Sequence, residues 1–232
     1  MESAIALGEH ITWSMSRHFN QLSSHERTAG WSLQAIMAIY RGTCDPLYLD
    51  AARRIATVAL REQKFDQGGA WPHLLPGDHA CGHPGARGNN VFLISVLLNG
   101  LLSYYEQTND PAVQKSIVAG AEWVLKSWDN RAGGWPYSAS TTGEPFGKAD
   151  AGMNSLIVEP LAYVGHLVGD ERFLQVAESG FAAVVRRGPD SSGKYLAMNM
   201  NATAATMQLL QQWYAKCRAD QGCSVLDGGP KP

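Results

Sequence analysis

The feature that most constrains the fold of this chain is an internal repeat of about 60–65 residues. The motif YRGTCDP at residues 40–46 returns 65 positions later as YEQTNDP at residues 105–111. In each copy an apolar helical segment precedes the motif, an amphipathic helical segment follows it, and a loop with Gly-Gly and Trp comes next. Because the turn, the helix character and the loop recur together, the pattern predicts an all-α array of helical hairpins sharing one core.

The hydrophobic periodicity predicts where these helices lie. A segment that is apolar on most sides is expected to be an inner helix, and a segment with one charged face is expected to be an outer helix. The inner helices are predicted at residues 27–40, 90–106, from 153 onward and at 203–214, and the outer helices at 4–19, 47–63, 112–128 and from 172 onward. We therefore expect one hairpin-repeat domain over residues 1–220, with a flexible tail at 221–232.

Composition excludes several classes of protein. The chain has 232 residues and a net charge of −2, so it has no basic field for nucleic acid. No apolar run is long enough to span a membrane, and the N-terminus does not read as a signal peptide. These features predict a cytoplasmic protein, or a secreted one whose signal is absent from the sequence. The four cysteines form no CxxC pair, and a disulfide between Cys217 and Cys223 is the pairing the spacing favours.

The longest connector, residues 68–90, reads GGAWPHLLPGDHACGHPGARGNN. Its glycines and prolines argue against a regular helix or a central strand. A loop of roughly 20 residues within a compact domain is usually functional or disordered, and its Trp and His content argues against disorder. We therefore expect this connector to contribute to a functional site.

Inner and outer helices that alternate with G-G-x-W-P loops resemble the α/α-toroid enzymes, also called six-hairpin glycosidase-like folds. The segments TAGWSLQAIMAIYRGTCDPLYLDAARRI, NNVFLISVLLNGLLSYYEQTNDPAV and AGGWPYS carry the resemblance, which covers roughly residues 27–214. It implies a carbohydrate-active enzyme, either a polysaccharide lyase or a glycoside hydrolase acting on uronic-acid sugars. A closed ring would need about 360 residues at this period, so the resemblance implies a toroid or a partial arc of one, with association into a homo-oligomer left open.

In such a stack, the loops before the inner helices line a common cleft. Aromatic rings stack on sugar rings, whereas Asn and Arg bond hydroxyls and carboxylates. The residues expected to bind a carbohydrate substrate are Arg27, Trp31, Trp71, Asn89, Asn90, Trp135, Asn154 and Tyr195. For Trp71 and Trp135 a second interpretation stays open, in which these rings pack each hairpin against its neighbour.

The two reactions need different residues. A lyase needs a cation for the uronate carboxylate, together with a base and an acid, and Arg87, His79, His83 and Tyr137 are the expected catalytic residues. Arg27 is a second candidate for the cation. A hydrolase instead needs two carboxylates. The candidate acids for hydrolysis are Asp66, Asp78, Glu144, Asp150 and Glu159, the last on an otherwise apolar helix.

Two further alternatives remain from the sequence. His79, Cys81 and His83, with Asp78 and His73 nearby, offer zinc ligands, although their spacing matches no standard motif. The leading expectation is that no cofactor is needed. The chain could also be a non-catalytic helical-repeat module that binds glycan or protein.

Overall fold

The computed structural model describes residues 2–22, 25–187 and 193–220, and within these ranges it contains eight α-helices and a four-stranded sheet. The helices are α1 (Glu2–His18), α2 (Glu26–Thr43), α3 (Pro46–Glu62), α4 (Val91–Thr108), α5 (Pro111–Lys126), α6 (Asn154–Val168), α7 (Glu171–Arg187) and α8 (Gly193–Asp220). The tail predicted at residues 221–232 lies outside the described residues. All the predicted helices are present, most with ends within two or three residues of the prediction.

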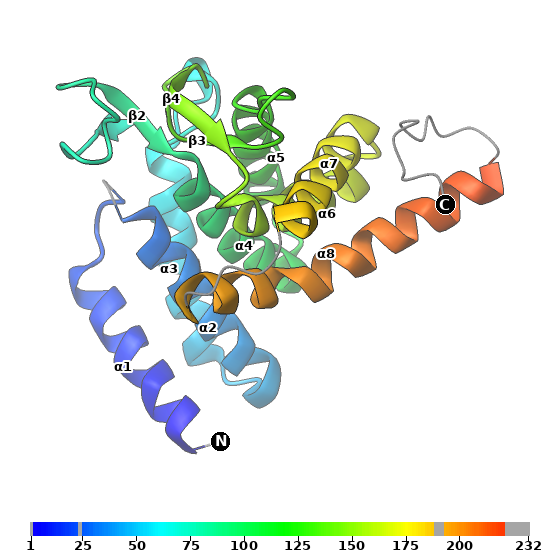
Figure 1. The fold of residues 1–232 in the computed structure, drawn as a ribbon. Helices are drawn as coiled ribbons and strands as arrows, with labels where there is room; N and C mark the ends of the chain where they lie inside the picture. Colours follow the sequence, from blue (N-terminus) through cyan, green and yellow to red (C-terminus); the bar gives the residue numbers. More distant parts are fainter. Residues whose placement is uncertain (1, 23–24, 188–192, 221–232) are drawn as a thin grey trace.

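The helices alternate between inner and outer positions, as the repeat predicts. The inner helices pack in series, α2 against α4, α4 against α6 and α6 against α8, while α3, α5 and α7 each pack on the inner helix of their own hairpin. Three hairpins, α2–α3, α4–α5 and α6–α7, are thus flanked by α1 and α8 (Figure 1). α4 is buried along most of its length because nearly every position on it is apolar.

The same short turn joins the helices of the first two hairpins. Cys44 and Asn109 end the inner helices in the left-handed conformation, with φ of 57° and 50°. Asp45 and Asp110 then cap the outer helices, each accepting a backbone N–H bond two residues later, at 2.9 and 2.8 Å. A proline occupies the first helical position, where its missing N–H costs nothing. The recurring YxxTxDP motif therefore encodes a helix stop followed at once by a helix start.

The connectors between hairpins form a sheet, which the sequence did not predict. Its strands are β1 (His73–Leu74), β2 (Arg87–Asn90), β3 (Trp135–Ser140) and β4 (Pro145–Asp150), all antiparallel and in that order. β2 lies between β1 and β3, so the expectation that the first connector holds no central strand is wrong. Gly88 makes this pairing possible, because a Cβ there would lie 2.0 Å from the backbone oxygen of Ala139. The sheet gathers both connectors at one end of the helices (Figure 1).

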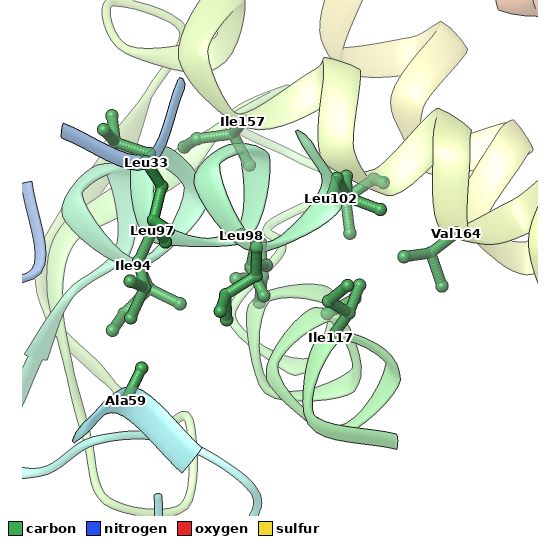
Figure 2. Packing of buried hydrophobic residues seen from close by; sticks show 14 of the residues in the cluster. Leu33, Ala59, Ile94, Leu97, Leu98, Leu102, Ile117, Ile157 and Val164 are labelled. Carbon is green, nitrogen blue, oxygen red and sulfur yellow. The ribbon is translucent and has the colours of Figure 1, made fainter. Parts of the chain in front are cut away.

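One hydrophobic core runs from Met15 to Cys217 and unites the helices. Figure 2 shows residues of α4, among them Leu97 and Leu98, meeting side chains of the neighbouring helices. α2 and α4 are in close backbone contact at two glycines. A Cβ on Gly30 would lie 2.2 Å from the backbone oxygen of Val96, and one on Gly100 would lie 2.6 Å from that of Gly30. The absence of side chains there allows the two inner helices to touch through their backbones.

The C-terminal helix differs from the prediction. α8 begins at Gly193, about ten residues before the inner helix predicted at 203–214, so Tyr195 lies in a helix and not in an aromatic loop. The side chain of Tyr195 lies outside the described residues. Cys217 is disulfide-bonded, while Cys44 and Cys81 are free thiols, and Cys223 lies outside the described residues. Within the described ranges, no helix has the length and apolarity needed to cross a membrane.

Candidate functional site

The two connectors are locked together by a small polar network at the start of α4. The side-chain oxygen of Asn90 lies 2.9 Å from Nδ1 of His79, and its amide nitrogen donates to the hydroxyl of Ser138 at 2.6 Å. That hydroxyl donates in turn to the backbone oxygen of His79 at 2.5 Å. Asn90 is buried by these contacts, so its amide holds the sheet on α4 and is not free to bond a sugar.

Of the four residues expected to be catalytic, the structure brings two together. The rings of His79 and Tyr137 meet edge to face with centroids 5.5 Å apart, and Tyr137 also packs on Phe92 at 5.1 Å. His83 instead packs against Phe146, and the Arg87 guanidinium donates to the backbone oxygen of Pro72 at 3.4 Å. His79 and Tyr137 therefore form one group, whereas His83 and Arg87 have other neighbours.

The two connector tryptophans pack between outer helices, where burial leaves little of either ring to contact a sugar. Trp71 is 2% exposed and Trp135 is 4% exposed. Their indole N–H groups donate to backbone oxygens of the preceding outer helix, at Ala59 (2.7 Å) and Val124 (2.9 Å). Each ring also lies against a glycine of the next outer helix, which are Gly120 and Gly180 respectively. The structure therefore supports the second interpretation of these residues, in which they join successive hairpins.

Asn89 and Asn154, which were expected to bind substrate, are also buried, and their amides bond other groups of the protein. The amide of Asn89 donates to Glu26 and to the backbone oxygen of Trp71, each at 2.7 Å. The amide of Asn154 donates to the backbone oxygens of Gly133 (2.9 Å) and Gly180 (3.0 Å). Both side chains satisfy backbone groups where a connector meets the start of an inner helix.

Of the expected substrate-binding residues whose side chains the structure describes, Arg27 and Trp31 are exposed. They lie one turn apart on α2, with the guanidinium 5.4 Å from the centre of the indole ring. Trp31 is 47% exposed, which is unusual for so large an apolar ring. An indole presented in this way can stack on the apolar face of a sugar.

The zinc alternative receives no support from the geometry. Within the described residues, no group of three or more His, Cys, Asp and Glu side chains is close enough to hold a metal ion. His79 and His83 face different partners, as given above, and Cys81 lies near Gly147. The residues present therefore do not fit a zinc site.

A pocket of about 440 Å³ lies where the inner helices face one another, toward the C-terminal ends of α2 and α4. Pockets of this size accept small organic ligands. Amide, hydroxyl, carboxyl and guanidinium groups line it, with few apolar side chains. The lining residues are Gln34, Ala38 and Arg41 of α2, Asn99, Leu102, Ser103 and Glu106 of α4, and Glu159 and Tyr163 of α6.

Glu159 has the most altered acidity in this pocket. Burial raises the pKa of its carboxyl to about 7, and the charge of Glu106 adds to the effect. A hydrogen bond from the Asn99 amide, 3.4 Å long, acts in the opposite direction but is outweighed. The carboxyl is placed there because Glu159 lies on a helix that is otherwise apolar and buried. Near neutral pH this group can hold a proton and release it.

Glu106 presents a second carboxyl in different surroundings. It is partly exposed, and one of its oxygens lies 4.0 Å from the guanidinium of Arg41. The hydroxyl of Tyr163 interacts with the same carboxylate, and burial, together with that charge and contact, raises the pKa of Tyr163 to about 12. Tyr163 therefore keeps its proton at neutral pH. The pocket pairs one carboxyl that is easily protonated with one held beside a cation.

The sequence pointed to one member of this pair. Glu159 was among the five candidate acids, and the signal was an acidic residue on an apolar helix. Glu106 was missed, because it lies at the end of α4 and reads as an ordinary surface charge. The other four acids are not in the pocket and are exposed. Asp66 lies in a short 3₁₀ helix, Asp78 in a turn and Glu144 between β3 and β4, while Asp150 accepts a bond from Arg187 at 3.3 Å.

The described residues have the α/α-toroid fold and contain three of its helical hairpins. No model of a known protein family and no curated protein sequence matches it. Among solved structures, it is similar to a GH76 α-mannanase from Bacteroides thetaiotaomicron, with 14% identity and a TM-score of 0.59, over 85% of this chain and 53% of that one. The chain thus spans about half the length of that enzyme.

It is also similar to the unsaturated glucuronyl hydrolase of Bacillus sp. GL1, described as responsible for degradation of glycosaminoglycan, with 14% identity and a TM-score of 0.63. That match covers 91% of this chain and 68% of the hydrolase. A third similar structure, described as a UGL variant with the sugar dGlcA-Glc-Rha-Glc, has a TM-score of 0.62 and also covers 91% of this chain and 68% of the other. At this level of identity the likeness establishes the fold, and the chemistry has to be argued from the residues.

Proposed function

We propose that the protein is a carbohydrate-active enzyme that hydrolyses glycosidic bonds. The reaction takes place in the pocket lined by α2, α4 and α6, called here the inner-helix pocket. The observation that carries the proposal is the pairing of Glu159 and Glu106 in one cavity, with the pKa of Glu159 raised to about 7. Glycoside hydrolysis uses two carboxyl groups in unlike environments, one protonated and one ionised. The fold, which is shared with a mannanase and a glucuronyl hydrolase, supports the same class of substrate.

Each carboxyl has a role that follows from its surroundings. Glu159 gives its proton to the leaving glycosidic oxygen as the bond to the anomeric carbon breaks. The Glu106 carboxylate either takes a proton from the attacking water or attacks the anomeric carbon itself, the two routes such pairs follow. Arg41, 4.0 Å from the Glu106 carboxylate, and the hydroxyl of Tyr163, which interacts with it, orient this group. Gln34, Asn99 and Ser103 offer donors and acceptors for sugar hydroxyls.

Arg27 and Trp31 extend this site along α2. Trp31 lies three residues before Gln34, or about 4.5 Å along the helix axis, and at 100° per residue the two side chains project from nearby parts of its surface. A sugar unit next to the one in the pocket can stack on the indole. This arrangement makes Trp31 a binding residue and not a catalytic one.

The identity of the products tests the proposal. The full chain is incubated with panels of neutral and uronate-containing oligosaccharides, and both reducing ends and the ultraviolet absorbance of unsaturated sugars are followed. Hydrolysis predicts new reducing ends without the absorbance. The variants Glu159→Gln and Glu106→Gln should each lose about 10²-fold or more in rate, while the exposed Glu144→Gln should behave as wild type. Unsaturated products would contradict hydrolysis in favour of β-elimination, and binding without products would indicate a non-catalytic module.

A further inference from the structure

The charged side chains that line the inner-helix pocket affect whether it binds a neutral or a negatively charged sugar. We propose that the sugar unit bound between Glu159 and Glu106 is a neutral hexose and not a uronic acid. This inference rests on the proposed function and refines it. It also departs from the acidic substrate that the sequence resemblance implies.

The cation in the pocket is already engaged. Among the described residues that line the cavity, Arg41 is the sole Lys or Arg, and its guanidinium lies 4.0 Å from the Glu106 carboxylate. A uronate carboxylate is normally held by a charge-assisted bond to such a group, most strongly by a two-pronged bond to arginine. A uronate bound here would therefore have to share Arg41 with Glu106.

A uronate would also bring a third carboxyl group beside two that are already present. Burial is the larger cause of the raised pKa of Glu159, but the charge of Glu106 also disfavours its ionisation across the cavity, and the same repulsion would act on a uronate carboxylate placed beside them. Like charges placed together across an interface select against a partner. A neutral hexose adds no charge, and its hydroxyls match the amides and hydroxyl of Gln34, Asn99 and Ser103.

The other arginine on this part of α2 is not in the pocket. Arg27 precedes Gln34 by seven residues, which is about 10 Å along the helix, and its guanidinium lies over the Trp31 ring. A charged group on a neighbouring sugar unit can reach Arg27 without entering the cavity. The inference therefore concerns only the unit at the two glutamates.

Matched substrates test this inference. Aryl hexosides and the corresponding aryl hexuronides, with the same leaving group and gluco, galacto or manno configuration, are compared at pH 6. For any pair that is cleaved, kcat/KM for the neutral member should be at least tenfold higher. The Ala38→Arg variant adds a cation at an exposed lining position and should narrow this ratio at least threefold, whereas Thr142→Arg, on the β3–β4 turn, should leave it unchanged.

The outcomes separate the two proposals. Preferential cleavage of the hexuronide would overturn the neutral-sugar inference and leave hydrolysis standing. If nothing is cleaved, the proposed function fails, and binding of neutral and uronate oligosaccharides to Glu159→Gln then decides the inference alone. A preference for the neutral ligand supports it, while a preference for the uronate, or no binding at all, overturns it.

Discussion

Nδ1 of His73 lies 3.0 Å from a carboxylate oxygen of Glu26, which is completely buried at the start of α2. The Asn89 amide donates to the same oxygen at 2.7 Å, so one carboxylate ties both arms of the first connector to α2. The other oxygen of Glu26 and Nε2 of His73 make no hydrogen bond within the described part of the chain. Removing one partner of this buried pair would leave the other without its charge partner, so we expect a substitution there to lower the free energy of unfolding.

This pair predicts a pH-dependent stability. Burial lowers the pKa of His73, but the hydrogen bond and charge of Glu26 outweigh it and raise the pKa above the usual 6.5. Because the folded state holds this proton more tightly than the unfolded state, the stabilisation is full below pH 6.5 and is lost as pH rises through the raised pKa. Urea unfolding at a series of pH values should show that decline.

Substituting His73 and an exposed histidine distinguishes the effect of this pair from that of other histidines. His73→Gln leaves the Glu26 carboxylate without its cation, so we expect a loss of about 3–5 kcal/mol at pH 6 and no decline above pH 6.5. The exposed His10→Gln should keep both the stability and the decline. An unchanged pH profile in His73→Gln would show that the pair does not hold the connector.

The contact between α2 and α4 predicts opposite effects for two glycines of one helix. Gly30→Ala should destabilise the protein by about 1–3 kcal/mol, because its Cβ would overlap backbone atoms of α4 that cannot rotate away. Gly42→Ala meets nothing within 4 Å and should be stabilising by about 0.5–1 kcal/mol through helix propensity. Urea denaturation measures both. Equal effects at the two positions would mean that the helices are not in backbone contact.

Substitutions of Trp71 and Trp31 should affect different properties, the stability of the fold and the affinity for glycan respectively. Trp71→Phe removes the indole N–H and leaves the backbone oxygen of Ala59 buried without that partner, at a cost of about 1–3 kcal/mol. Trp31→Ala removes an exposed ring, so stability should change by less than about 0.5 kcal/mol while glycan affinity falls roughly tenfold. Calorimetric unfolding and glycan titration of the two variants give the comparison. Loss of affinity in Trp71→Phe without loss of stability would reverse these roles.

Local patterns allowed much of the fold to be predicted from the sequence. The YxxTxDP motif fixes a left-handed helix stop, an aspartate cap and a proline start within a few residues, so the inner–outer turns were recognisable. The apolar composition of α4 similarly identified a helix buried on most sides. The sheet was missed because its pairing joins Gly88 to Ser140 across 52 positions, and long-range pairing leaves little trace in local composition.

The site was harder to predict, for a related reason. Trp71 and Asn89 are residue types that often bind sugars, but both are buried and hydrogen-bonded to backbone groups, so they stabilise the fold. Their burial depends on the tertiary structure, which the local sequence does not reveal. Glu159 stood out because its helix is apolar, whereas Glu106 became meaningful only when α4 placed it beside Arg41. The sequence located the connectors and one acid, and the packing of the inner helices located the pocket.

The proposed hydrolysis depends on a Glu159 carboxyl that is protonated near neutral pH. NMR of the carboxyl carbons measures this protonation without a known substrate. Spectra of protein labelled with ¹³C in the glutamate carboxyl groups are recorded from acid to alkaline pH for wild type and Glu159→Gln. We predict one resonance that titrates near pH 7, disappears in Glu159→Gln, and moves to lower pH in Glu106→Gln. If the resonance lost in Glu159→Gln titrates near the ordinary glutamate value of about 4.3, Glu159 is not the proton donor and the account is contradicted.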